Sequence, residues 1–161
     1  MSMFCYQCQE TAKNQGCTVV GVCGKKEDVA NIQDLLIYTI KGISQIVKKG
    51  NLDIKELGKL NHEMLTSLFM TITNANFDKE AIENQIKKML VYRDELNHDL
   101  GLEGLNDSAT FQVSTIEEME EKANSPEVRI LATENVDVRS LRELITYGLK
   151  GMAAYGEHAL N

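Results

Sequence analysis

The sequence predicts an all-α protein with a cysteine-rich loop at its N-terminus. Three observations lead to this fold class. Apolar residues recur at helical spacing in several long stretches after residue 27. The 161 residues include a single proline, so long helices can run uninterrupted. All four cysteines precede residue 24, and the character of the chain changes after the last of them.

Three long helices joined by short turns are expected between residues 27 and 101. The first covers residues 28–49, and the second covers 53–73 and ends at a polar break at 74–76. The third covers 78–100 and begins with an aspartate at its expected N-cap. Short turns place successive helices side by side in opposite directions, which predicts an up-down three-helix bundle.

Residues 102–136 are expected to form a linker that contains one short helix. Ser114 and Glu117 have the spacing of a capping box, so we expect this helix to run from Thr115 to about Ala123. A short apolar segment at 128–131 is expected to be extended.

The last expected helix, 137–161, repeats the first. Leu35 to Gly42 align with Leu144 to Gly151, and each residue pairs with the one 109 positions later. Chance similarity of two amphipathic helices is the alternative, but the repeat predicts two related bundles, with 137–161 opening the second. A second bundle needs more helices, so we expect this chain to be the N-terminal part of a longer protein. Cover by the first bundle, or self-association through the last helix, would also bury its apolar face.

Charge and hydropathy exclude several partners. Seventeen basic and 24 acidic residues give a net charge of −7, which repels the phosphate backbone of nucleic acids. No apolar run approaches the roughly 20 residues that cross a bilayer, so no membrane contact is expected. The N-terminus has no secretory signal, so the expected location is the cytoplasm, where thiols stay reduced.

The four cysteines carry the chemistry of the sequence. Cys5, Cys8, Cys17 and Cys23 have the spacing C-x2-C-x8-C-x5-C, and four thiolates from one segment suit a [4Fe–4S] cluster. Glycines beside the last two cysteines permit tight turns, and the valines among them are expected to form an apolar wall. Zinc is the main alternative, although only the first pair has the spacing of a zinc knuckle. Disulfides are least favoured, because no secretion signal is present.

The cysteine motif resembles that of a known family. Residues 5–11 (CYQCQET), 16–17 (GC) and 21–24 (GVCG) resemble the N-terminus of the hybrid-cluster, or prismane, proteins, a family of hydroxylamine reductases. Residues 131–135 and 144–159 resemble the same family, so the resemblance extends along the whole chain. It implies that Cys5, Cys8, Cys17 and Cys23 hold a [4Fe–4S] cubane, because the [2Fe–2S] variant has wider gaps.

The resemblance also implies that electron transfer and catalysis are carried out by different domains. Full members resemble carbon monoxide dehydrogenase in fold and carry a catalytic hybrid iron–sulfur–oxygen cluster in later α/β domains. No position here matches the ligands of that cluster, and no cysteine follows Cys23. No catalytic residue is therefore expected.

The expected function is that of the electron-transfer domain of a hydroxylamine reductase. It would pass electrons from an external redox donor to the remaining domains of the parent protein. The acidic surface of this chain would suit a donor with a basic surface. The parent would convert hydroxylamine to ammonia and water, with nitric oxide as a second candidate substrate. A stand-alone ferredoxin-like carrier and a zinc-stabilised helical interaction module are the alternatives.

Other chemically notable residues have ordinary explanations. His62, His98 and His158 have no partners at ligand spacing, so surface or packing roles are expected. The acidic run 117–121 is expected to be a solvated helix face. Tyr38 and Tyr147 are expected in the bundle core, with a role as redox relays as the alternative. The pair Lys25-Lys26 would offset the negative charge of a cluster held by four thiolates.

Overall fold

A computed structural model of the chain describes residues 3–72 and 76–160. Within these ranges it contains six α-helices, three short 3-10 helices and no β-strand, which confirms the all-α prediction. The α-helices are α1 (Glu27–Lys49), α2 (Gly58–Met70), α3 (Lys79–Leu100), α4 (Asp107–Thr110), α5 (Ile116–Ala123) and α6 (Val136–Leu160). The 3-10 helices are Ala12–Asn14, Ile54–Glu56 and Ile130–Ala132.

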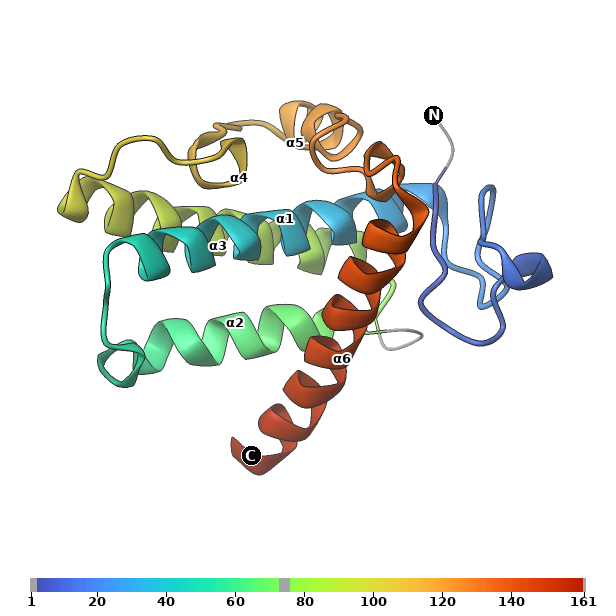
Figure 1. Cartoon of the computed structure of the whole chain (residues 1–161), viewed down its shortest axis with the longest axis horizontal. Helices are drawn as coiled ribbons and strands as arrows, with labels where there is room; N and C mark the ends of the chain where they lie inside the picture. Colours follow the sequence, from blue (N-terminus) through green and yellow to red (C-terminus); the bar gives the residue numbers. More distant parts are fainter. Residues whose placement is uncertain (1–2, 73–75, 161) are drawn as a thin grey trace.

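Helix α1 is the centre of the molecule. It contacts α2 and α3, with which it forms a bundle, and α4 and α5, which lie across the opposite side (Figure 1). Its apolar residues are buried on more than one side, and Leu35, Leu36 and Ile43 are fully covered. Each such side chain stabilises the fold by about 1.5–3 kcal/mol relative to an exposed one. Because α1 is covered on several sides, it contributes many of the buried apolar side chains of the core.

The second helix is shorter than its periodicity predicts. Instead of one helix over 53–73, the 3-10 helix Ile54–Glu56 comes first and α2 begins at Gly58. The side chain of Asp53 accepts a hydrogen bond from the Lys55 N–H at 2.9 Å, which favours a separate turn at this point. The α-helix ends at Met70, and the predicted break at 74–76 lies partly outside the described residues.

The linker corrects three sequence-based expectations. The capping box is formed by Thr115 and Glu118 rather than by Ser114 and Glu117. Both pairs have the required spacing, but the observed one turns Met119 and Ala123 into the core. A second short helix, α4, forms in the linker, where one helix is expected, and the expected extended segment at 128–131 overlaps the 3-10 helix Ile130–Ala132.

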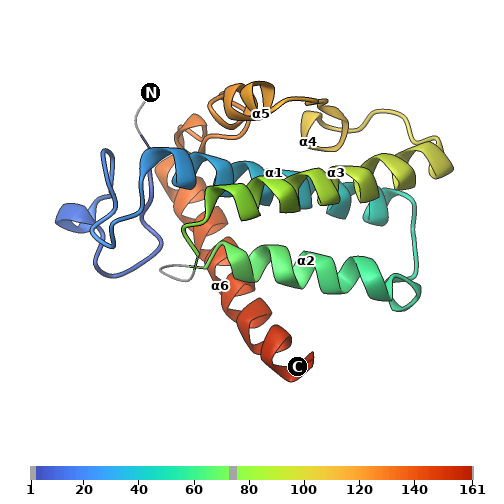
Figure 2. The same cartoon turned by 180° about the vertical axis from the view of Figure 1, so that it is seen from behind.

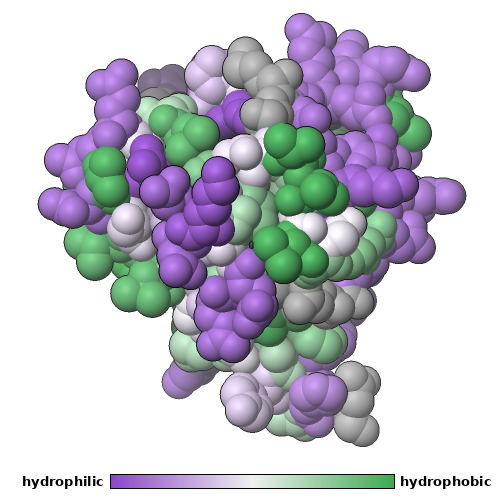
Figure 3. Space-filling model, turned by 90° about the vertical axis from the view of Figure 1, so that its right-hand side faces the viewer, coloured by the Kyte–Doolittle hydropathy of each residue, from purple (hydrophilic) through white to green (hydrophobic). Residues whose placement is uncertain are grey.

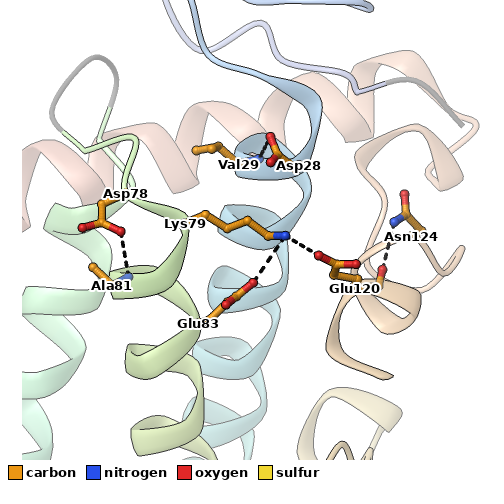
Figure 4. Close-up of polar contacts among 8 residues, drawn as sticks. All are labelled: Asp28, Val29, Asp78, Lys79, Ala81, Glu83, Glu120 and Asn124. Atoms are coloured by element: carbon orange, nitrogen blue, oxygen red, sulfur yellow. Dashed lines mark hydrogen bonds and ion pairs between the residues drawn. The ribbon is translucent and has the colours of Figure 1, made fainter. Parts of the chain in front are cut away.

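The start of α3 confirms the predicted cap and ties α3 to α5 (Figure 4). The side chain of Asp78 accepts a hydrogen bond from the Ala81 N–H at 3.1 Å. The Lys79 ammonium pairs with Glu83 of the same helix at 3.5 Å and also with Glu120 of α5. This lysine thus joins two helices that both pack on α1.

Helix α6 crosses the end of the bundle, and the cysteine loop lies beyond it in both views (Figures 1 and 2). It begins at Val136, one residue before the predicted start, and packs against α2. At this contact the Thr66 hydroxyl lies 3.1 Å from a carboxylate oxygen of Glu157. In the described part of the chain, no helix combines the length and apolarity needed to span a bilayer.

Candidate functional site

Backbone hydrogen bonds bring the first and third cysteines together. The Cys5 N–H donates to the Cys17 carbonyl at 3.0 Å, and the Cys17 N–H donates to the Cys5 carbonyl at 2.8 Å. This pair is an isolated antiparallel bridge. The Thr11 hydroxyl donates to the Cys5 carbonyl at 3.1 Å and lies 3.8 Å from the Cys17 sulfur. Cys5 and Cys17, which are eleven intervening residues apart, are therefore held side by side by the backbone of the loop.

The second and fourth cysteines lie in tight turns. The Thr11 N–H donates to the Cys8 carbonyl at 3.2 Å, just before the 3-10 helix Ala12–Asn14. Near Cys23, the Gly24 N–H donates to the Gly21 carbonyl at 2.8 Å, and Gly24 has a φ of 89°. A side chain at that φ would be strained, so the predicted need for glycine in this turn is confirmed.

Gly21 lies close to the thiol of Cys23. A Cβ atom at this position would lie 3.0 Å from the Cys23 sulfur and 3.2 Å from the backbone nitrogen of Lys25. The missing side chain leaves room for the thiol beside the backbone. A carbonyl–amide hydrogen bond from the Gly21 N–H to the Lys25 carbonyl, at 2.8 Å, closes this turn.

All four cysteines are free thiols. Cys17 is buried, and the other three are half-buried. Burial raises the pKa of Cys5, against the lowering effects of a backbone hydrogen bond at Gln7 and the charges of Lys25 and Lys150. Burial also acts on Cys17, but hydrogen bonds from Ala12, Val22 and Thr11 outweigh it and lower the pKa of that thiol. A lower pKa favours the thiolate, which is the form that binds metal.

The valines of the loop do not form the expected apolar wall. Val19, Val20 and Val22 are all exposed. The loop lies on the face turned toward the viewer in Figure 3, where hydrophobic and hydrophilic groups alternate. The apolar packing at the loop comes instead from Met3 and Ala30, which are buried together with Cys17.

The four cysteine thiols are the candidate metal ligands of the loop. Among residues 3–72 and 76–160, no three His, Cys, Asp or Glu side chains are grouped as ligands of one metal ion. A zinc ion holds its thiolates at about 2.3 Å, which requires the sulfurs to meet within about 4 Å of one another. An iron–sulfur cluster keeps its thiolates farther apart, because the iron and sulfide atoms lie between them. Four free thiols on one loop have the donor chemistry of both kinds of site.

Two buried lysines, one of which the sequence interpretation missed, lie behind the cysteine loop. The Lys150 Nζ of α6 donates to the Gln7 side-chain oxygen at 3.0 Å and to the Thr71 carbonyl at 3.2 Å. The Lys25 Nζ donates to the Gln33 side-chain oxygen at 2.6 Å. A signal for Lys150 exists in the sequence: it lies at helical spacing from Thr146 and Ala153, and these three residues form the buried face of α6.

The electrostatics of this region follow from burial. Burial raises the pKa of Asp34, while the charges of Lys150 and Lys25 act in the opposite direction. Burial lowers the pKa of Lys150, and the carboxylate of Asp34 opposes that shift. Asp34 and Lys150 therefore interact electrostatically beneath the loop, and the charge of Lys25 acts on both.

The remaining sequence candidates lie away from the cysteines or on the surface. His62, His98 and His158 are exposed, as expected, and the ring of His158 packs edge-on against Phe69. The acidic residues of α5 are exposed, as expected. Tyr38 packs against the main core, whereas Tyr147, which was also expected in a core, is exposed.

The fold and the loop define an all-helical protein with a cysteine-rich N-terminal segment, and the comparisons agree. The sequence profile of the Prismane/CO dehydrogenase family matches residues 3–161, and the chain belongs to this family. Membership implies iron–sulfur clusters.

Several proteins similar to this chain are named hydroxylamine reductase. A hydroxylamine reductase of Acetivibrio thermocellus is 64% identical over 161 residues, which are 100% of this chain and 29% of that protein. One of Clostridium perfringens is 54% identical and covers 100% of this chain and 30% of its own length. One of Methanocaldococcus jannaschii is 49% identical, with 99% and 29% covered. The chain thus spans about 30% of the length of the relatives it matches.

Proposed function

We propose that this chain is the electron-transfer domain of a hydroxylamine reductase and that Cys5, Cys8, Cys17 and Cys23 hold one [4Fe–4S] cluster. The observation that carries the proposal is a set of four free thiols on one N-terminal loop in a prismane-family chain. When bound, such a cluster supplies one-electron transfer. The chain itself supplies the thiolates, the hydrogen bonds that hold them and the partial burial that tunes the potential.

The reaction proposed for the longer protein is a two-electron reduction. Hydroxylamine takes up two electrons and two protons as its N–O bond breaks, and yields ammonia and water. The catalytic residues are proposed to lie outside residues 1–161, and no residue of this chain has a catalytic role in the proposal. Electrons come from an external redox donor in the cytoplasm, and nitric oxide is a second candidate substrate.

The partner proposed for α6 is the remainder of the longer protein. The apolar side chains on the outer face of this helix, among them Leu141, Leu144 and Met152, are exposed. Their repeat equivalents on α1 are buried by neighbouring helices. The relatives are more than three times as long as this chain, so they have the residues to provide helices equivalent to α2 and α3. We propose that such helices cover this face.

Anaerobic reconstitution tests the cluster. After incubation with iron and sulfide, we expect about four irons and four sulfides per chain and an electron paramagnetic resonance signal on reduction. Serine variants of each of the four cysteines should lower the iron content, whereas the exposed His98→Gln should not. Two irons per chain would point to a [2Fe–2S] cluster. One zinc per chain without sulfide would favour a zinc-stabilised module instead.

A further inference from the structure

Lys150 connects the last helix of the chain to the cysteine loop. Its side chain is 1% exposed, although the opposite face of α6 is open to solvent. Its ammonium group donates hydrogen bonds to Gln7, which lies between Cys5 and Cys8, and to the backbone of Thr71. A buried ammonium group is costly to desolvate, so a fold that keeps one here needs compensation from its surroundings.

The groups that accept hydrogen bonds from the Lys150 ammonium group are uncharged. Both acceptors of Lys150 are neutral oxygens, from an amide side chain and from a backbone carbonyl. Neutral acceptors solvate the cation but leave its net charge in place. In the poorly polarisable interior the field of such a charge extends farther than that of an exposed lysine.

That field reaches the cysteines. The Lys150 ammonium group donates to the side chain of Gln7, which follows Cys5 by two positions and directly precedes Cys8, so it lies next to the first cysteine pair. Burial raises the pKa of Asp34 of α1 to about 7, and both Asp34 and Glu143 of α6 oppose the lowering of the Lys150 pKa. Two buried lysine side chains therefore lie on the protein side of the loop, and the acidic groups of Asp34 and Glu143 act on Lys150 from α1 and α6.

We propose that Lys150 is a positioning residue for the iron–sulfur site, one that raises the reduction potential of the cluster and holds the Cys5–Cys8 turn through Gln7. The inference rests on the proposed function, because it concerns the cluster assigned to the four cysteines. One-electron reduction by an external donor adds one negative charge to a group that four thiolates already make negative. A nearby buried cation stabilises the reduced state more than the oxidised state, so the potential rises.

The repeat provides a matched control. Lys41 of α1 holds the place in the first helix that Lys150 holds in the last, 109 residues later. Lys41 is exposed and Lys150 is buried. Removal of the Lys41 charge tests the same chemical change on the same helical motif where solvent screens it.

The test is a redox titration of the reconstituted chain, followed by electron paramagnetic resonance and visible absorption. Lys150→Met should shift the midpoint potential to a more negative value at unchanged iron content. Lys150→Arg, which keeps the charge, and Lys41→Met should leave the midpoint near that of the unsubstituted chain. Circular dichroism verifies that each variant is helical. If Lys150→Met does not fold, Lys150→Gln, which keeps a hydrogen-bonding end without the charge, replaces it.

The outcomes separate this inference from the proposed function. An unsubstituted chain that takes up no iron and sulfide would overturn the proposed function. A Lys150→Met chain with full iron content and an unshifted midpoint would overturn the inference and leave the proposed function standing. Loss of the cluster in both neutral variants, with full loading of Lys150→Arg at an unshifted midpoint, would replace potential tuning by a purely structural role.

Discussion

Leu35 and Leu144 occupy equivalent places in two helices that begin 109 residues apart, yet Leu35 is 0% exposed and Leu144 is 66% exposed. Helix α1 begins at Glu27 and α6 begins at Val136, so the repeat includes the helix start as well as the motif. Neighbouring helices cover α1 on several sides. On the outer face of α6 the same apolar pattern remains open to solvent.

This difference in exposure predicts effects of very different size for the same substitution at the two positions. Leu35→Ala should reduce the free energy of unfolding by about 2–5 kcal/mol, because it leaves a cavity in the core. Leu144→Ala should change it by less than about 0.5 kcal/mol in this chain, because the side chain is mostly exposed. Urea unfolding followed by circular dichroism measures both, and equal losses would show that α6 is covered in solution.

The same face predicts the association behaviour of the chain. Exposed contiguous apolar side chains favour association, so the chain should form dimers or larger species at high concentration. The double variant Leu144→Gln/Met152→Gln should remain monomeric in sedimentation experiments. In a longer protein that contains the covering helices, the same pair should instead lower the free energy of unfolding by several kcal/mol. Unchanged stability there would contradict the proposed covering of α6.

A close backbone contact predicts the effect of a glycine substitution. A Cβ atom on Gly42 of α1 would lie 2.0 Å from the carbonyl oxygen of Ser108 in α4. Gly42→Ala should therefore displace α4 and cost about 1–3 kcal/mol. Gly151 is the repeat equivalent in α6 and has no atom within 4 Å of such a Cβ.

The matched control is Gly151→Ala. Alanine is the better helix former, so this variant should be more stable by about 0.5–1 kcal/mol. Thermal unfolding of both variants gives the comparison. A Gly42→Ala chain as stable as the parent would mean that α4 is not docked on α1 as described.

The carboxylate of Asp107 predicts a pH dependence. Burial opposes the shift, but hydrogen bonds from Lys122 at 2.6 Å and Tyr38 at 2.8 Å lower the pKa of Asp107 in the folded state. Its contribution to stability is therefore full above the unfolded pKa of about 4 and is lost as the pH falls through the lower folded pKa. The side chain is partly exposed, so solvent screening limits the contribution to about 0.5–1 kcal/mol.

Asp107→Asn should be less stable than the parent at pH 7 by that amount, and the difference should vanish near pH 2. Urea midpoints at the two pH values measure it. The exposed Asp99→Asn is the control and should differ little from the parent at either pH. A difference that grows on acidification would give the opposite sign and contradict the assignment.

A buried arginine predicts that lysine cannot replace it. Arg93 of α3 is fully buried, donates to the Phe111 carbonyl at 2.5 Å and lies over the Phe111 ring at 4.5 Å. The planar guanidinium makes both contacts at once, whereas an ammonium group cannot. Arg93→Lys should lower the free energy of unfolding by about 1–3 kcal/mol in urea titrations. Exposed Lys87→Arg serves as the control and should be neutral.

Local patterns were sufficient for much of the fold. Apolar spacing and breaks located α1, α3 and α6 to within one or two residues, because helical periodicity is a property of neighbouring residues. The pattern failed where two local solutions compete. Ser114 with Glu117 and Thr115 with Glu118 have the same spacing, and only packing of Met119 and Ala123 decides between them.

The sequence by itself determined the helical class, the repeat and the grouping of four cysteines on one loop. Tertiary structure alone decided which faces of the repeated helices are covered. Lys41 and Lys150 share one motif, but only Lys150 is buried, beside Gln7 and the backbone of Thr71. Burial depends on segments that are distant in the sequence and adjacent in space. A motif can therefore specify a helix but not the environment of its lysine.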